Sequence, residues 1–227
     1  MDDSVRGARG SPGRADWSVP RRRMVERLAA TGIRDRRVLA ALAEVPRHRL
    51  VPEALQAQAY RDAALPIGEG QTISAPGIVA AMSQALELEG HETVLEVGTG
   101  SGYQAAILSK LAGRVVSIER VQQLAARARR AFDDLGIRNV VVYWGDGTRG
   151  RPDDAPFDAI VVTAGGPSVP EPLLEQLAPG GRLVGPFGAR AEQRLVRVRR
   201  DGSHAYSEEL LGRCRFVDLV GTHGWSG

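Results

Sequence analysis

The stretch that decides the fold runs from Val94 to Tyr103 and reads VLEVGTGSGY. Its first four residues, mostly apolar, predict a buried strand, and the glycines that follow predict a turn leading into a helix. Glycine has no Cβ, so the backbone of such a turn can approach a bound ligand closely. We therefore expect a ligand site at the end of this strand, although an ordinary strand–turn–helix corner would have the same local pattern.

The spacing of the glycines separates two classes of ligand. A dinucleotide site needs Gly-x-Gly-x-x-Gly, but here the glycines are Gly98, Gly100 and Gly102, and Tyr103 stands where the third glycine should be. Glu96 precedes them, and a carboxylate there would repel a pyrophosphate but attract an ammonium group. S-adenosyl-L-methionine (SAM) carries such a group, so we expect SAM to contact Glu96 and the three glycines.

Two more acids end the next predicted strands. Glu119, followed by Arg120, could take both ribose hydroxyls of the ligand. It could equally be a carboxylate favoured by the following helix N-terminus. Asp146 with Gly147 could reach an adenine amino group, or could simply form a turn. Because ligands of open α/β sheets bind at the carboxyl ends of the strands, we assign all four residues to the SAM site.

Outward from this stretch, strands alternate with helices, which predicts an α/β fold with a doubly wound, mostly parallel sheet. Helical periodicity predicts a helical piece before the sheet, and two apolar runs around a polar turn predict an antiparallel hairpin after it. The predicted parallel strands are 93–97, 115–118, 140–144, 157–163 and 182–187, and the predicted hairpin strands are 193–199 and 211–220.

The length of 227 residues predicts one folded domain with one appendage. Residues 1–20 are rich in Gly, Arg, Ser, Pro and Asp and predict a disordered tail. We divide the domain 21–227 into three parts. These are a helical front piece with a substrate loop (21–75), a SAM-binding core (76–190) and C-terminal strands (191–227).

Composition limits the partners of the chain. Residues 1–23 hold six arginines against three aspartates, which gives +3, the net charge of the whole chain. The remainder is formally neutral, which argues against nucleic-acid binding. No apolar run is long enough for a membrane span, and the single Cys214 allows neither an internal disulfide nor a cysteine zinc site. We expect a cytoplasmic monomer without a metal.

A family resemblance rests on three segments. Residues 65–74 read LPIGEGQTIS, residues 45–48 read VPRH and residues 155–160 read APFDAI. With these segments the chain resembles the protein-L-isoaspartate O-methyltransferase family from about residue 24 to about residue 220. The resemblance implies a Rossmann-like fold of the SAM-dependent methyltransferase type. It also implies methyl transfer to the carboxylate of L-isoaspartyl and D-aspartyl residues in damaged proteins, which initiates repair through a succinimide.

The resemblance also implies the site residues. Ser74 corresponds to the active-site serine, Thr72 and Ile73 join it at the cofactor, and Ile73, Ser74, Phe216 and Val217 border the substrate. A substrate carboxylate is already ionised at neutral pH, so Ser74 would align it rather than activate it. The alternative is that Ser74 caps the helix that follows. No nucleophile accompanies His48, which we interpret as structural.

The chain departs from the family pattern at a few positions. Asp218 stands where proline is usual, Gly77 where a bulkier residue is usual, and Gly165 and Gly166 where alanines are usual. These changes leave open a carboxyl methyltransferase that acts on a dedicated peptide or small acid. The sequence is also compatible with a SAM-binding module without catalysis and with a nicotinamide dehydrogenase, although Tyr103 disfavours the dehydrogenase.

Overall fold

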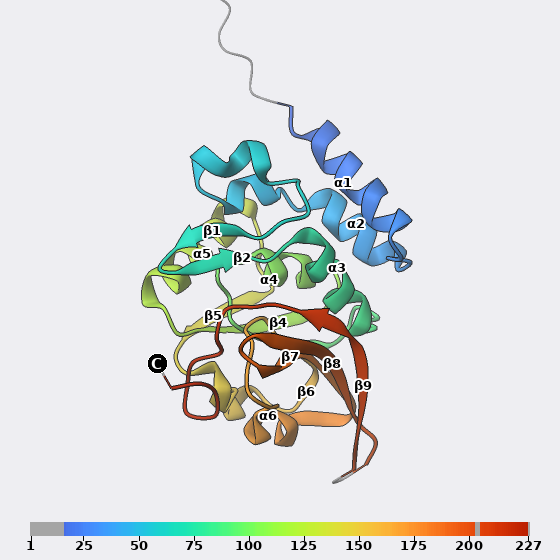
Figure 1. The fold of residues 1–227 in the computed structure, drawn as a ribbon, viewed down its shortest axis with the longest axis vertical. Coiled ribbons are helices and arrows are strands. Elements are labelled where there is room, and N and C mark those ends of the chain that lie inside the picture. Colours follow the sequence, from blue (N-terminus) through green and yellow to red (C-terminus); the bar gives the residue numbers. More distant parts are fainter. Residues whose placement is uncertain (1–15, 203–204, 227) are drawn as a thin grey trace, which may run out of the picture.

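A seven-stranded sheet forms the centre of the molecule (Figure 1). The structure is a computed structural model that describes residues 16–202 and 205–226. Its strands run in the order β5-β4-β3-β6-β7-β8-β9. The strands are β3 (Thr93–Val97), β4 (Arg114–Glu119), β5 (Val140–Trp144), β6 (Phe157–Val162), β7 (Leu177–Ala189), β8 (Glu192–Arg200) and β9 (Tyr206–Cys214).

The first five strands pair in parallel and the last two are antiparallel, which confirms the predicted fold class. The predicted range of the last strand is wrong. β9 begins at Tyr206, immediately after the turn, and pairs with Arg200 of β8. Its first residues are polar and exposed at the sheet edge, so they lack the apolar signal. The apolar residues that we assigned to this strand instead continue beyond it as an extended segment, residues 215–220.

Alternating side chains of the strands divide the core between the two faces of the sheet. Val94 and Val115 face the helices α1 to α5, whereas Leu95 and Val116 face the short helix α6 and the segment around Leu219. Figure 1 shows this division, with α1 to α5 on one side and α6 on the other. The helices are α1 (Ser18–Ala30), α2 (Arg36–Glu44), α3 (Pro76–Ala85), α4 (Tyr103–Leu108), α5 (Gln122–Leu135) and α6 (Glu171–Glu175).

The helical front piece begins earlier than predicted. Helix α1 starts at Ser18, so three residues that we placed in the tail are helical, while residues 1–15 lie outside the described residues. Trp17 stacks on His48, with ring centroids 4.9 Å apart, and the Nδ1 atom of His48 lies 2.8 Å from the hydroxyl of Tyr60. These contacts give His48 the structural role we expected. Asp35 caps α2 through the backbone N–H groups of the first turn.

The loop predicted before α3 contains a two-stranded sheet of β1 (Leu65–Gly68) and β2 (Gln71–Ile73). Its turn includes Glu69 and Gly70, with φ angles of 56° and 67°, a left-handed conformation that suits the glycine. Two 3₁₀ helices precede it, η1 (Arg47–Leu50) and η2 (Glu53–Gln58), and η3 (Gly147–Arg149) and η4 (Pro152–Asp154) follow β5. The hairpin ends directly before Ser74 and so brings it toward the sheet.

None of the helices within residues 16–202 and 205–226 has both the length and the apolar character needed to cross a bilayer.

Candidate functional site

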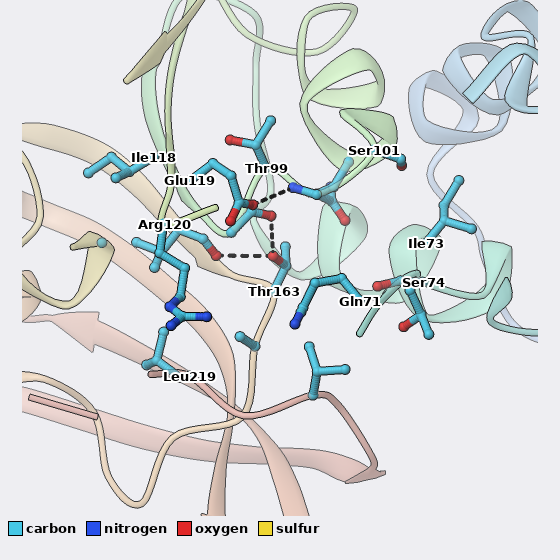
Figure 2. Close-up of a pocket in the computed structure, with 18 of the residues that line it drawn as sticks. Gln71, Ile73, Ser74, Thr99, Ser101, Ile118, Glu119, Arg120, Thr163 and Leu219 are labelled. Atoms are coloured by element: carbon cyan, nitrogen blue, oxygen red, sulfur yellow. Dashed lines mark hydrogen bonds between the residues drawn. The ribbon is translucent and has the colours of Figure 1, made fainter. Parts of the chain in front are cut away.

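A pocket lies at the carboxyl ends of the parallel strands, where the sequence predicts it; we call it the main pocket. The turn after β3, the end of β4 and the residues after β6 form its floor. The β1–β2 hairpin and residues 217–220 form its sides. Figure 2 shows Glu119 and Thr163 on the floor, and Ile73 and Ser74 across the pocket from Glu119. Eight of the residues predicted for the cofactor line it: Thr72, Ile73, Ser74, Gly98, Gly100, Glu119, Arg120 and Gly147.

At two positions of the turn, Gly98 and Gly102, neighbouring side chains leave no room for a Cβ atom. Gly98 has a φ of 99°, and a Cβ there would collide with the hydroxyl of Thr163, which hydrogen-bonds to the Gly98 carbonyl at 2.5 Å. Gly102 has a φ of 84°, and a Cβ there would meet the ring of Phe132 at 2.8 Å. Gly102 does not line the pocket and allows α4 to pack closely on α5, whereas its contact with the cofactor stays a prediction.

Glu119 is fixed by backbone donors. The N–H of Gly100 donates to Oε2 and that of Val121 donates to Oε1, both at 2.8 Å. The side chain is 5% exposed and borders the pocket. Each carboxylate oxygen can accept a further hydrogen bond. Glu119 therefore presents a fixed double acceptor to any ligand with two neighbouring hydroxyls.

Glu96 does not line the main pocket, and its contact with the ammonium group of SAM stays a prediction. Its side chain is fully buried on the helix-covered side of the sheet. Ser117, its neighbour in the paired strand β4, donates to Glu96 Oε2, and Thr99 Oγ1 lies 2.5 Å from Ser117 Oγ. Burial raises the pKa of Glu96 to about 8, so the neutral acid is the form that fits this place. The chain Thr99–Ser117–Glu96 braces the glycine turn from below.

Asp146 is absent from the lining of the main pocket, and its contact with adenine stays a prediction. Its carboxylate accepts hydrogen bonds from the N–H and the hydroxyl of Thr148 and from the N–H of Thr222. Burial would raise the pKa of Asp146, but these hydrogen bonds outweigh it and hold the pKa below its usual value. Asp146 anchors residues 221–222, whereas its neighbour Gly147 lines the pocket.

A second cavity, the side pocket, adjoins the main pocket. Ser74, Thr72, Thr163 and Val217 line both cavities. Ser74 does not cap α3, because Ala75 is the N-cap residue and no side chain caps this helix. Within the described residues the Ser74 hydroxyl has no hydrogen-bond partner, and it is free to contact a molecule at the junction of the two cavities.

The far wall of the side pocket is the segment that follows β9. Phe216 and Val217, which we predicted at the substrate, line this pocket together with Cys214, whose pKa burial raises to about 11. Arg213 and Arg215 line it as well. Ile73 lines the main pocket and not the side pocket, and its contact with the substrate stays a prediction. The side pocket is therefore bordered by apolar side chains, a neutral thiol and two arginines, which would attract a carboxylate.

Several lining residues were missed in the sequence. Thr163 is the last residue of a predicted strand, and the rule that ligands bind at the carboxyl ends of strands could have found it. Thr99 and Ser101 lie inside the quoted glycine turn, where only the glycines were considered. Leu219 and Val220 were not predicted to line the pocket, because they are far in the chain from most of the other lining residues and only the folded chain brings them together.

Comparisons with known proteins agree with this geometry. The model of the family "Protein-L-isoaspartate(D-aspartate) O-methyltransferase" matches residues 20–224. Protein-L-isoaspartate O-methyltransferase 2 of Geotalea uraniireducens is 58% identical over 92% of this chain and 97% of its own length. Protein-L-isoaspartate O-methyltransferase 1 of Syntrophobacter fumaroxidans is 59% identical over 93% of this chain and 99% of its own length.

Two solved structures have a similar fold. A protein-L-isoaspartate O-methyltransferase superposes with a TM-score of 0.82 at 29% identity, over 90% of this chain and 67% of its own. A Plasmodium falciparum protein, solved in complex with S-adenosyl-L-homocysteine, has a TM-score of 0.77 at 24% identity, over 88% of this chain and 98% of its own. The second likeness supports the fold alone.

Proposed function

The chain belongs to the protein-L-isoaspartate(D-aspartate) O-methyltransferase family, and from this premise we propose how its residues perform the reaction. It is a SAM-dependent enzyme that methylates isoaspartyl residues of damaged proteins during their repair. We assign the main pocket to SAM, the side pocket to the isoaspartyl residue, and the junction between them to the reacting groups.

The floor of the main pocket fits SAM in two respects. Gly98 and Gly100 line the pocket with bare backbone, at φ angles of 99° and 54° that suit glycine, so a ligand can approach the turn closely. Glu119 offers two acceptor oxygens, each already fixed by a backbone N–H, and this suits a ribose with two hydroxyls. Gly100, Arg120 and Gly147 complete this part of the proposed cofactor site.

The junction supports the proposed catalytic step. When bound, SAM supplies a methyl group on a sulfonium, and a carboxylate oxygen of the substrate accepts it. The Ser74 hydroxyl, which borders both cavities, donates a hydrogen bond to that carboxylate and holds one oxygen toward the main pocket. Fixing the orientation of two reactants lowers the entropic cost of the transition state. Ser74 forms no covalent bond in this scheme.

The substrate carboxylate needs no general base, because its usual pKa lies near 4. Neither cavity is lined by a histidine or a lysine among the described residues. We expect kcat to stay flat between about pH 6 and 8, the interval in which an essential histidine would titrate.

The role of Ser74 is tested by comparing Ser74→Ala with Ser101→Ala, because Ser101 lines the main pocket but not the side pocket. With an isoaspartyl peptide, Ser74→Ala should lower kcat roughly ten- to a hundredfold, the loss of a hydrogen bond to a charged group. SAM affinity from titration calorimetry should change by less than about threefold. Ser101→Ala should keep its kcat. Full kcat in Ser74→Ala would remove the proposed role.

We also propose the organisation of the working enzyme. Residues 18–226 would act as one folded unit and as a monomer, with isoaspartyl proteins and peptides as partners and without nucleic acid or membrane. The formal neutrality of the chain after residue 23 supports this proposal. The absence of cysteines other than Cys214 from the sequence supports a cytoplasmic location. Light scattering of the purified protein would test the monomer.

A further inference from the structure

A buried glutamine stands directly behind the wall of the side pocket. Gln193, in β8, is 1% exposed and has both ends of its amide on the backbone of Phe216. The N–H of Phe216 donates to Oε1 at 2.7 Å, and Nε2 donates to the Phe216 carbonyl at 3.2 Å. Phe216 lies two residues after β9, where no sheet ladder satisfies its backbone. The Gln193 amide therefore replaces a strand partner at this one residue.

Gly165 leaves the space that this amide occupies. A Cβ at Gly165 would collide with the amide atoms of Gln193. The φ of Gly165 is not in the left-handed region, so space and not backbone conformation is what requires glycine here. Gly165 also holds the wall, because its N–H donates to the Val217 carbonyl at 2.7 Å and its carbonyl accepts from the N–H of Leu219 at 2.9 Å.

We propose that Gln193 and Gly165 are a positioning pair that sets how well the side pocket binds the isoaspartyl segment of the substrate. The inference rests on the proposed function, in which Phe216 and Val217 border that segment. Neither Gln193 nor Gly165 lines a cavity, so both act through the backbone of the wall. A wall that is fixed before binding spares the substrate the cost of ordering it. Loss of the pair should therefore weaken peptide binding more than it slows methyl transfer.

The chain contains a second pair of the same construction, which serves as a matched control. Gln176 is 8% exposed and also clamps backbone at both ends of its amide. Its Oε1 accepts from the N–H of Arg151 at 2.7 Å, and its Nε2 donates to the Arg149 carbonyl at 2.8 Å. A Cβ at Gly150 would collide with this amide too. Neither Gln176 nor the two residues that it holds, Arg149 and Arg151, line the main or the side pocket.

The test compares Gln193→Met with Gln176→Met, two changes that keep side-chain volume and remove the amide. We expect both to lower the melting temperature by a similar amount. Only Gln193→Met should raise KM for an isoaspartyl peptide, by roughly tenfold, with kcat at saturation within about twofold. SAM affinity from calorimetry should stay within about threefold in both. An unchanged KM in Gln193→Met, or an equal rise in Gln176→Met, would overturn the proposal.

Two further variants keep the test decisive. Gly165→Ala should also raise KM for the peptide, because its Cβ displaces the Gln193 amide, and it should add little on a Gln193→Ala background, where the space is free. Full additivity would contradict the coupling. Phe216→Ala distinguishes a failure of the proposed substrate wall from a failure of the positioning pair alone. If it leaves KM unchanged, the proposed substrate wall is wrong; if it raises KM while Gln193→Met does not, only the positioning pair is wrong.

Discussion

The floor and the wall of the active site are built in different ways. The floor combines the ends of β3 and β4 with Thr163, which follows β6. Most of its bonds, such as Glu119 to the Gly100 N–H and Thr99 to Ser117, join residues about twenty positions apart, and Thr163 adds a longer link to Gly98. The wall, residues 215–226, is held by the nearby Gln193 and by Gly165 and Asp146, which lie much earlier in the chain. The floor is thus specified mainly by the segment from β3 to β4, and the wall mainly by the completed fold.

The floor and the wall should differ in how well they tolerate substitution. The floor residues depend on one another, because the turn contains glycines with left-handed φ angles and rests on the buried hydrogen bonds of Thr99, Ser117 and Glu96. A change there disturbs several bonds at once. The wall is an extended segment held by separate hydrogen bonds, each of which can be lost alone. We expect substitutions in the floor to affect SAM binding strongly, and substitutions in the wall to change substrate preference in small steps.

The most severe test of the floor is Gly98→Ala. The φ of 99° strains any side chain, and the Cβ would collide with the Thr163 hydroxyl. We expect a loss of at least about 2 kcal/mol in SAM binding or in the free energy of unfolding. Titration calorimetry measures the SAM affinity, and thermal unfolding measures the stability. Gly145→Ala is the control, because nothing lies within 4 Å of its Cβ position; an equal effect there would show that the turn has no special requirement.

Glu96→Gln tests whether the floor rests on a neutral acid. The pKa of Glu96 is raised to about 8 in the folded state, from a usual 4.5 in the unfolded chain. Its contribution to stability is therefore complete below about pH 4.5 and decreases as the pH rises toward 8, by up to about 1.4 kcal/mol per pH unit. Glutamine cannot ionise, so the variant should gain stability relative to the parent across this interval. Parallel curves of unfolding free energy against pH would contradict a neutral Glu96.

Glu119→Ala and Asp146→Ala compare two acids that the sequence analysis assigned to the same SAM site. Glu119 borders the main pocket, whereas Asp146 has its carboxylate on Thr148 and the wall residue Thr222. We expect Glu119→Ala to weaken SAM binding by about 1–3 kcal/mol, the value of charge-assisted hydrogen bonds. Asp146→Ala should have a smaller effect on SAM affinity and should lower the melting temperature. A larger loss of SAM affinity in Asp146→Ala than in Glu119→Ala would support the predicted adenine contact of Asp146.

The smallest expected effect is in the wall. Trp225 donates its indole N–H to the Gly165 carbonyl at 2.9 Å, next to the bond from Leu219. Trp225→Phe removes this bond and keeps most of the ring, so we expect a loss of about 1 kcal/mol in stability, or roughly 2–4 °C in melting temperature. Peptide KM should rise by no more than about threefold. A collapse of SAM binding in this variant would show that floor and wall are not separable.

The fold was predictable from the sequence wherever apolar periodicity was strong. The five parallel strands follow from local patterns and are confirmed, but β7 begins at Leu177, before the predicted range 182–187. The start of β9 at Tyr206 could not be predicted, because the first residues of this edge strand are exposed and mostly polar and lack the apolar alternation of a buried strand. The β1–β2 hairpin was also missed, because its strands are only four and three residues long.

The site was predictable only in part, because residue type does not reveal which way a side chain points. Glu96 and Glu119 are both acids near the glycine turn, yet the alternation of β3 sends Glu96 toward the helices and leaves Glu119 at the pocket. Asp146 was assigned to the SAM site because the sequence could not show that the N–H of Thr222 donates a hydrogen bond to its carboxylate. Gln193 carried no signal at all, since its partner Phe216 is 23 positions away and its importance comes from burial.

The wall has a consequence for biosynthesis. A ribosome makes the segment from β3 to β7 before the wall, and this segment already contains the glycine turn, Glu119 and Thr163. Residues 217–220, which line the main pocket, are translated only after all seven strands, and Trp225 and Thr222, which anchor them, follow later still. We therefore expect the main pocket to close only after the segment that follows β9 has been synthesised and has docked on the sheet.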